Sequence, residues 1–159
     1  MTAELDPERT GTGLRYALIA AHGCDVAMLA VEVMLDHDPD HTAGSGGARF
    51  LPAGAPLPMG ALPVIVADST VYGTARAEQL LRVWPAELPR PCLITVDDAP
   101  SGPPPDARYR IRALGARLTA AVRVPYLPVL RTVNDPADAI DHQDVSAAAA
   151  KLRRHLEGI

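Results

Sequence analysis

The sequence predicts a three-layer α/β/α sandwich built on a mainly parallel sheet, and three observations lead to this prediction. Short apolar runs without strict alternation recur along the chain, as in strands that are covered on both faces. Segments with helical periodicity separate these runs, and strands that alternate with helices form the βαβ units of parallel sheets. Hydrophobic residues make up 48% of the chain but aromatic residues only 4%, which indicates a layered core of Ala, Val and Leu.

The 159 residues suit a single domain. We expect this domain to cover residues 13–159, and a disordered polar tail to cover residues 1–12. The tail does not read as a signal peptide and no apolar run is long enough to span a membrane, so we expect a cytoplasmic protein without a membrane partner. The net charge of −4 indicates no global attraction to nucleic acid. The two cysteines, Cys24 and Cys92, suggest neither a disulfide framework nor a thiolate metal site.

The first strand is expected at residues 14–20, and the first helix from about residue 24 to residue 35. This helix is apolar nearly all round, and its length favours a buried helix over a strand. Residues 36–61 then carry five glycines and four prolines, which are typical of turns and loops. We expect a flexible loop over this segment, with at most a short strand at residues 49–51.

The second strand is expected at residues 62–67, followed by a helix from about residue 74 to residue 84. Glu78 and Arg82 should form an outward pair on this helix, because residues four apart are neighbours on its surface. Pro85 ends it. The apolar residues that recur at helical spacing, and should face the sheet, are Ala77, Leu80, Leu81 and Trp84.

Two more strands are expected at residues 92–96 and 121–124, and a helix from about residue 106 to residue 118 connects them. Its packed stripe consists of Ile111, Leu114 and Leu118. The last helix is expected from about residue 145 to residue 157. Its expected N-cap is Asp144 or Ser146, and its expected buried residues are Leu152 and Leu156.

The turn between the first strand and the first helix lies where a nucleotide-binding α/β domain carries its phosphate loop. It consists of His22, Gly23, Cys24 and Asp25. It contains no G-K-[ST], and Lys151 near the C-terminus is the only lysine of the chain, so no nearby lysine can reach a phosphate. Two interpretations stay open: backbone N–H groups of the turn bind an anion, or Asp25 caps the helix, which we favour. Cys24 is either an activated thiolate beside His22 or, as we favour, a small semi-buried residue.

Acidic residues follow two of the predicted strands, where a P-loop enzyme keeps the acid that holds magnesium through water. They are Asp68, Asp97 and Asp98, of which Asp68 and Asp97 are the candidate catalytic residues. The alternative, which we favour, is that these acids only end strands and cap the next helix. Residues 36–41 (DHDPDH) carry metal-ligand side chains, but Pro39 breaks the helix that would align them, so we expect a solvated loop and no metal site.

Arginines concentrate on the helix before the last strand and on that strand. They are Arg108, Arg110, Arg112, Arg117 and Arg123. On a helix, Arg108 and Arg112 share one side while Arg110 and Arg117 share another. This surface could contact a phosphate backbone or an acidic partner, and the first four arginines are the candidate interaction residues. A solvated outer helix face is the simpler interpretation, and we favour it.

Four segments together show a resemblance to a known group of proteins. They read AAHGCDVAMLA, LPVIVADSTVYGTARAEQLLRVWP, CLITVDDAPSGPPPDARYRIRALGARL and VRVPYLPVLR. Over roughly residues 14–131 the chain resembles a little-characterised group of actinobacterial proteins related to the ParA/MinD division of P-loop NTPases. His22 and Gly23 match the start of that group's phosphate loop. Residues 97–100 partly match its D-A-P-like turn, and Pro125, Tyr126 and Arg131 match its last motif.

The resemblance implies a P-loop-NTPase-like fold, but the chain departs from the family pattern in the loop. Cys24 and Asp25 replace loop glycines, while Ala27 and Met28 stand where the magnesium-binding Ser or Thr is sought. An aspartate there also places negative charge at the helix end that would attract phosphate. The loop is therefore a degenerate one.

Our leading hypothesis is a non-catalytic accessory or interaction protein of a plasmid, mobile-element or partition-like system. It would act with a protein partner or as a homodimer, without a cofactor. The first alternative is a nucleotide-binding or NTP-hydrolysing switch with an atypical phosphate loop, which would use ATP and magnesium. The second is an accessory protein that contacts nucleic acid through the arginine-rich helix.

Overall fold

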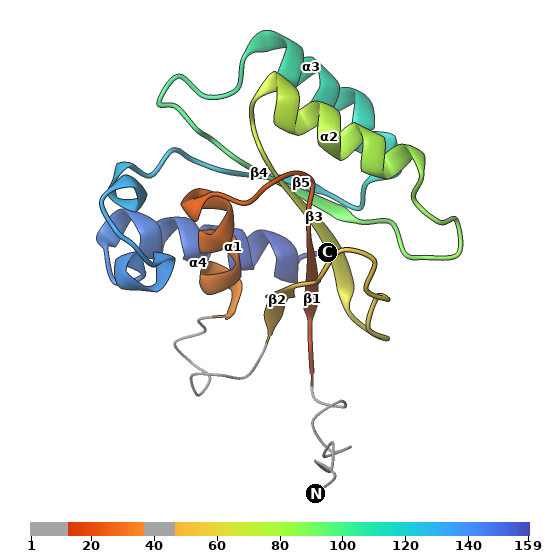
Figure 1. The fold of residues 1–159 in the computed structure, drawn as a ribbon, viewed down its shortest axis with the longest axis horizontal. Coiled ribbons are helices and arrows are strands. Elements are labelled where there is room, and N and C mark those ends of the chain that lie inside the picture. Colours follow the sequence, from red (N-terminus) through yellow and green to blue (C-terminus); the bar gives the residue numbers. More distant parts are fainter. Residues whose placement is uncertain (1–12, 37–46) are drawn as a thin grey trace, which may run out of the picture.

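The computed structural model describes residues 13–36 and 47–159, and it contains a five-stranded sheet in which every neighbouring pair of strands is parallel (Figure 1). The strand order is β2-β1-β3-β4-β5. The strands are β1 (Tyr16–Ala20), β2 (Ala48–Phe50), β3 (Leu62–Asp68), β4 (Cys92–Val96) and β5 (Ala121–Val124). The predicted α/β class with a parallel sheet is confirmed. The predicted tail and part of the predicted loop, residues 1–12 and 37–46, lie outside the described residues.

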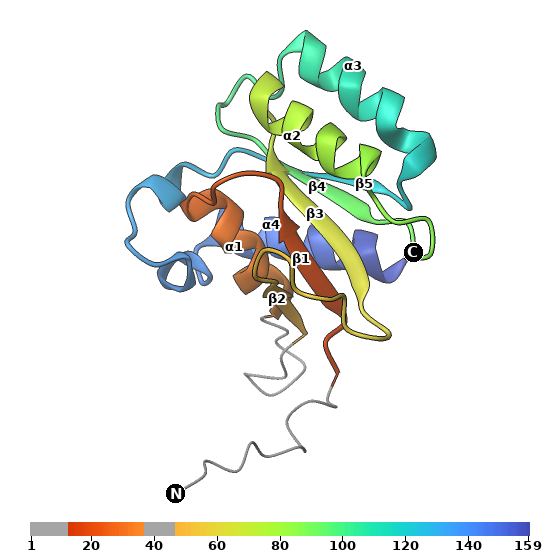
Figure 2. The ribbon, with the colours of Figure 1, turned by 45° about the vertical axis from the view of Figure 1, so that its right-hand side comes forward.

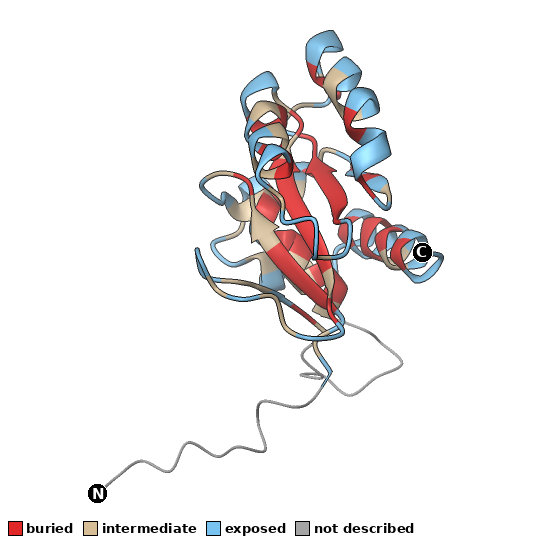
Figure 3. Cartoon of the chain, turned by 90° about the vertical axis from the view of Figure 1, so that its right-hand side faces the viewer, coloured by how far each residue is buried: buried red, intermediate tan, exposed pale blue. Residues whose placement is uncertain are grey.

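Two pairs of helices cover the two faces of the sheet (Figures 1 and 2). One pair is α1 (Val26–Asp36) and α4 (Gln143–Glu157), and the other is α2 (Val71–Arg82) and α3 (Pro105–Leu114). Alternate residues of a strand point to opposite faces, so Val64 and Val66 pack in the core beneath α1 and α4, whereas Ile65 and Ala67 pack beneath α2 and α3. Figure 3 shows the sheet as the buried centre of the molecule. The arrangement is a three-layer α/β/α sandwich.

The strand order determines where a site can form. In a 2-1-3-4-5 sheet, the order reverses between β1 and β3, and ligands of such folds bind outside the carboxyl ends of the strands at that reversal. Here this place is occupied by the turn after β1 and by the end of β3. The carboxyl ends of β4 and β5 lie farther along the same edge. That the fold is of the P-loop-NTPase type stays a prediction.

Several element boundaries differ from those predicted. Helix α2 begins at Val71, three residues early, because the Thr70 side chain caps it. Helix α3 ends at Leu114, and the next three residues form a 3₁₀ turn, so Arg117 lies outside the helix. The predicted N-caps of the last helix are wrong: His142 caps it, since its Nδ1 accepts the backbone N–H of Asp144 at 3.3 Å.

Other predictions hold. Strand β2 is short and lies one residue from its predicted position. In α2, Ala77 and Leu81 are buried, while Leu80 and Trp84 are partly buried against the same cluster. The Arg82 and Glu78 side chains pair at 3.0 Å, as the i, i+4 spacing predicts. In α4, Leu152 and Leu156 are both buried.

The buried thiol of Cys92 makes stability sensitive to high pH. Burial raises the pKa of Cys92 to about 12, so this thiol stays neutral in the folded state over a range where the unfolded chain ionises. Stability from this group is therefore complete below the unfolded pKa of about 8.5 and is lost as pH rises toward 12. We expect unfolding titrations to show a decline of up to about 1.4 kcal/mol per pH unit above pH 9. Cys92→Val should flatten this slope, and an equal slope in both proteins would contradict the assignment.

Candidate functional site

The turn between β1 and α1, for which we predicted a degenerate phosphate loop, is capped by its own aspartate. Asp25 Oδ1 accepts the backbone N–H of Met28 at 2.9 Å, and the Asp25 carbonyl accepts the N–H of Leu29 at 3.0 Å. These are the interactions of an N-cap residue with the first turn of α1. The carboxylate thus sits at the positive helix end, where an anion would bind. Of the two interpretations of this turn, the structure favours the capped helix.

The other residues of the turn also lack the features of a reactive site. Cys24 is exposed, and partial desolvation, followed by the charges of Asp25 and Glu32, raises the pKa of its thiol. The thiol is therefore protonated at neutral pH, which argues against an activated thiolate. We also predicted a semi-buried Cys24, but the structure shows that this residue is exposed.

His22 connects the two strands that flank the reversal of strand order. The backbone N–H of Asp68, at the end of β3, donates to His22 Nε2 at 3.1 Å. His22 Nδ1 lies 3.0 Å from the carbonyl of Gly23, which can only accept, so Nδ1 carries the proton. These two partners assign the neutral Nδ1–H tautomer. The imidazole fixes the turn to β3 and leaves neither ring nitrogen for a ligand.

The Asp68 carboxylate organises the start of α2. Its Oδ1 accepts the backbone N–H of Thr70 at 3.2 Å and also the Thr70 hydroxyl, while Thr70 Oγ1 accepts the N–H of Gly73 at 2.9 Å. Gly73 comes so close that a Cβ atom there would lie 2.6 Å from the Asp68 carbonyl oxygen. Asp68 therefore holds the residue that caps α2, Thr70, and does not cap the helix itself, and its Oδ1 is engaged in these hydrogen bonds.

Asp97, the second candidate acid, is a buried carboxylate paired with Arg123. The residue is 2% exposed, and Arg123 Nε donates to its Oδ2 at 2.6 Å from the neighbouring strand β5. This hydrogen bond raises the pKa of Arg123. Asp97 Oδ1 is buried and has no hydrogen-bond partner among residues 13–36 and 47–159. The pair binds β4 to β5 at the carboxyl edge of the sheet.

A cavity of about 370 Å³ lies between the start of α1 and the ends of β4 and β5. It brings together Asp25, Asp97, Asp98, Tyr126 and Arg131, all of them residues that the sequence singled out. Arg131 Nη1 donates to the Tyr126 hydroxyl at 3.4 Å, and this contact raises the pKa of Arg131. The lining carries three carboxylates and one guanidinium, so its net charge is negative. His22 and Asp68 do not line it; they lie at the ends of β1 and β3.

The candidate interaction arginines separate into three environments. Arg108 and Arg112 are exposed and line a second cavity, beside α3. Arg110 connects α3 to α2: its Nε donates to Glu78 Oε2 at 2.9 Å, and its Nη1 donates to the carbonyl of Val71 at 3.0 Å. Arg117 is exposed on the turn after α3. The Arg110–Glu78 pair could not be predicted from the sequence, because its two residues lie 32 positions apart on different helices.

Acidic residues at the end of α1 have a structural role as well. Glu32 Oε2 accepts the N–H of Phe50 at 3.2 Å, and Asp36 Oδ1 accepts the N–H of Ala48 at 3.4 Å. Both hydrogen bonds hold strand β2. The remainder of the histidine and aspartate cluster, residues 37–41, lies outside the described residues.

Within the part of the chain that the structure describes, no group of three or more His, Cys, Asp or Glu residues could hold a metal ion. None of the helices described is long and apolar enough to cross a membrane. Comparison with models of protein families gives no match, and comparison with curated proteins gives none either. What the residues around the turn can do chemically therefore follows from their own geometry and charges.

The capping role of Asp25 leads to a prediction for stability. Asp25→Ala leaves the N–H of Met28 without its partner, so we expect a loss of about 1 kcal/mol in the free energy of unfolding. Asp25→Asn should lose much less, because an amide oxygen also accepts this hydrogen bond. Urea denaturation of the two variants measures the difference. Equal and negligible losses would contradict the capping assignment.

Proposed function

We propose that the chain is a degenerate relative of the P-loop NTPases, of the ParA/MinD type, that acts as a non-catalytic accessory or interaction protein. The system we propose for it is plasmid-borne, mobile-element or partition-like. One observation carries the proposal: the Asp25 carboxylate occupies the N-terminus of α1 and accepts the N–H of Met28 at 2.9 Å. That N–H group is one of those that a phosphate would need.

The charges around the turn support the same proposal. The adjoining cavity is lined by Asp25, Asp97 and Asp98, and with Asp97 paired to Arg123 two carboxylates stand against the single guanidinium of Arg131. A nucleotide triphosphate is strongly anionic, and phosphoryl transfer depends on cationic groups that neutralise its charge. The turn supplies no lysine, and no hydroxyl residue stands at Ala27 or Met28 to hold magnesium. In this proposal the turn retains the strand-turn-helix place of a phosphate loop without the residues that its chemistry needs.

Exposed aromatic residues support a protein partner. Tyr72 on α2 is 65% exposed and Tyr109 on α3 is 72% exposed, although aromatic residues make up only 4% of the chain. They belong to the two helices that cover the same face of the sheet, and the hydrogen bond from Arg110 to the carbonyl of Val71 joins these helices. Tyrosine is enriched in the centres of protein interfaces. This layer of the sandwich is thus the surface that we propose for a protein partner or a second copy of the chain.

Calorimetric titration with ATP or GTP in the presence of magnesium tests the proposal, together with a phosphate-release assay. We expect neither saturable binding at micromolar nucleotide nor turnover. Asp25→Asn, which removes the competing charge but keeps the cap, serves as the matched variant. Micromolar binding together with turnover by the unaltered protein would end the proposal.

The alternative is a nucleotide switch whose lysine comes from a partner, and the cavity at the start of α1 is the observation that favours it. Tyr126 and Arg131 line this cavity, and both match the last motif of the resemblance. In that case hydrolysis should appear on addition of the partner, and Asp97→Ala should abolish it. Nucleotide turnover that Asp97→Ala leaves intact would contradict this alternative.

A further inference from the structure

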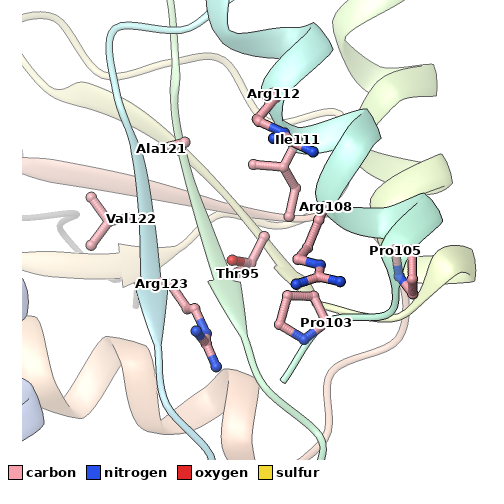
Figure 4. A pocket seen from close by; sticks show the side chains of 9 residues that line it. All are labelled: Thr95, Pro103, Pro105, Arg108, Ile111, Arg112, Ala121, Val122 and Arg123. Carbon is pink, nitrogen blue, oxygen red and sulfur yellow. The ribbon is translucent and has the colours of Figure 1, made fainter. Parts of the chain in front are cut away.

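A second cavity, of about 400 Å³, lies between α3 and the edge of the sheet formed by β4 and β5 (Figure 4). None of its lining residues also lines the cavity at the start of α1. Its walls come from the start of α3 and the preceding proline-rich connection, and its floor comes from β4 and β5. The volume falls within the range of small-molecule sites, about 300–1,000 Å³.

The cavity carries an excess of positive charge. Arg108 and Arg112 reach it from α3 and Arg123 reaches it from β5, so three guanidinium groups line one space. Neither Arg108 nor Arg112 has an ion-pair partner in residues 13–36 and 47–159. Arg123 is neutralised by Asp97, whose carboxylate is buried. Within the described part of the chain, the positive charges of Arg108 and Arg112 are thus left without compensation.

Thr95 adds a hydrogen-bonding group to the floor of the cavity. This residue of β4 is 4% exposed, and Figure 4 shows it between Arg108 and Arg123. It lines the cavity, and its hydroxyl has no hydrogen-bond partner in the described chain. This hydroxyl is not a fully buried one: the buried side-chain atoms without a partner in the described chain are Ser69 Oγ and Asp97 Oδ1. It is therefore open to the cavity and free to donate a hydrogen bond there. A ligand oxygen in the cavity would supply the missing partner.

The position of Arg123 is built into the fold. Gly102 has a φ of +75°, and a Cβ atom at this residue would lie 2.7 Å from Arg123 Nη2. With Arg123 in this position, the connection before α3 passes close to the guanidinium at a residue that has no side chain, and the positive φ favours glycine there. Asp97 holds the same guanidinium through a hydrogen bond. The remaining lining includes apolar groups, among them Ile111 and Pro103.

We propose that this cavity binds a small phosphate monoester that carries an apolar group. A phosphate monoester has a charge between about −1.5 and −2 at neutral pH, which matches the two uncompensated arginines. Guanidinium groups bind phosphate oxygens through pairs of parallel hydrogen bonds, and the Thr95 hydroxyl adds one more donor. The apolar group packs against Ile111. This site is separate from the turn at Asp25 and does not depend on the function proposed above.

Calorimetric titration with three probes tests the proposal: phenyl phosphate, inorganic phosphate and benzoate. We expect phenyl phosphate to bind most tightly, since phosphate lacks the apolar group and benzoate lacks the second charge. Arg108→Ala and Arg112→Ala should each weaken phenyl phosphate binding roughly tenfold, as expected for loss of a charge-assisted hydrogen bond. Arg117→Ala is the matched control, because it removes the same charge from an exposed site outside the cavity.

Thr95→Val separates binding from folding. It should weaken phenyl phosphate binding but leave the melting temperature of the free protein nearly unchanged, since the Thr95 hydroxyl makes no hydrogen bond within the described chain. Absence of saturable binding at millimolar phenyl phosphate would overturn the proposal. An equal loss of phenyl phosphate affinity in Arg117→Ala and Arg108→Ala would also overturn it, because it would indicate a general attraction of anions. Tighter binding of benzoate than of phenyl phosphate would overturn it as well, because it would indicate a carboxylate site.

Discussion

Arg123→Ala is expected to lower the free energy of unfolding by about 3 kcal/mol, because it leaves the charge of Asp97 buried and unpaired. The Asp97 side chain is 1% exposed, and its Oδ1 already has no hydrogen-bond partner among the described residues. Its other oxygen accepts from Arg123 Nε at 2.6 Å. The Arg123 side chain is 56% exposed, so water can reach its guanidinium. We therefore expect a loss at the lower end of the range of free energies found for breaking a buried ion pair.

A double-mutant cycle identifies the source of this loss. Removing both side chains, in Arg123→Ala with Asp97→Ala, should be less damaging than the sum of the two single variants, because no buried charge is then left unpaired. Arg90→Ala, an exposed arginine away from the pair, is the control and should change stability by less than about 0.5 kcal/mol. If Arg123→Ala were no worse than Arg90→Ala, the pair would have no structural importance.

Gly73→Ala is expected to be similarly damaging, with a loss of about 2–3 kcal/mol, since overpacking of a buried position forces the backbone to shift. The added methyl group would overlap the Asp68 carboxylate and lie 2.6 Å from the Asp68 carbonyl oxygen. Its accommodation requires the end of β3 and the start of α2 to separate. The capping interactions of Thr70 would be lost with it.

Gly115→Ala gives a matched control for this change. Gly115 has a φ of −54°, and no heavy atom of its surroundings lies within 4 Å of the added Cβ position. The same substitution should therefore stabilise the protein slightly, by up to about 1 kcal/mol, through the unfolded state. Chemical denaturation of both variants measures the contrast. Equal changes in Gly73→Ala and Gly115→Ala would show that the contact with Asp68 is not limiting.

The helices and strands were predictable where the signal is local. The spacing of Ala77 and Leu81 predicts one buried helix face, and the apolar run at 62–67 predicts a strand that is covered on both faces. Both patterns can be recognised from residues that are neighbours in the sequence. The cap of α4 was missed since histidine is not among the preferred N-cap residues. The end of α3 was missed because Ile111, Leu114 and Leu118 keep helical spacing across the 3₁₀ turn.

The site was predictable only in part. That Asp68 and Asp97 lie at the carboxyl edge follows from their places at strand ends. Their partners do not follow from the sequence, because they depend on the strand order. Asp68 bonds to His22 between the ends of β1 and β3, while Asp97 bonds to Arg123 between β4 and β5. The second cavity combines Thr95 with Arg108, which belong to different layers. Such contacts are set by tertiary packing and leave no local pattern in the sequence.

The central claim is that Asp25 already occupies the anion position at the start of α1, and the backbone amide signals of Met28 and Leu29 test it most directly. Their ¹⁵N–¹H chemical shifts would be followed during addition of ATP and magnesium, with the amide of Gly73, capped by Thr70, as the internal control. We expect no saturable change at Met28 or Leu29 beyond that of Gly73. A saturable change confined to these two amides would contradict it, since it would place the nucleotide where the carboxylate lies.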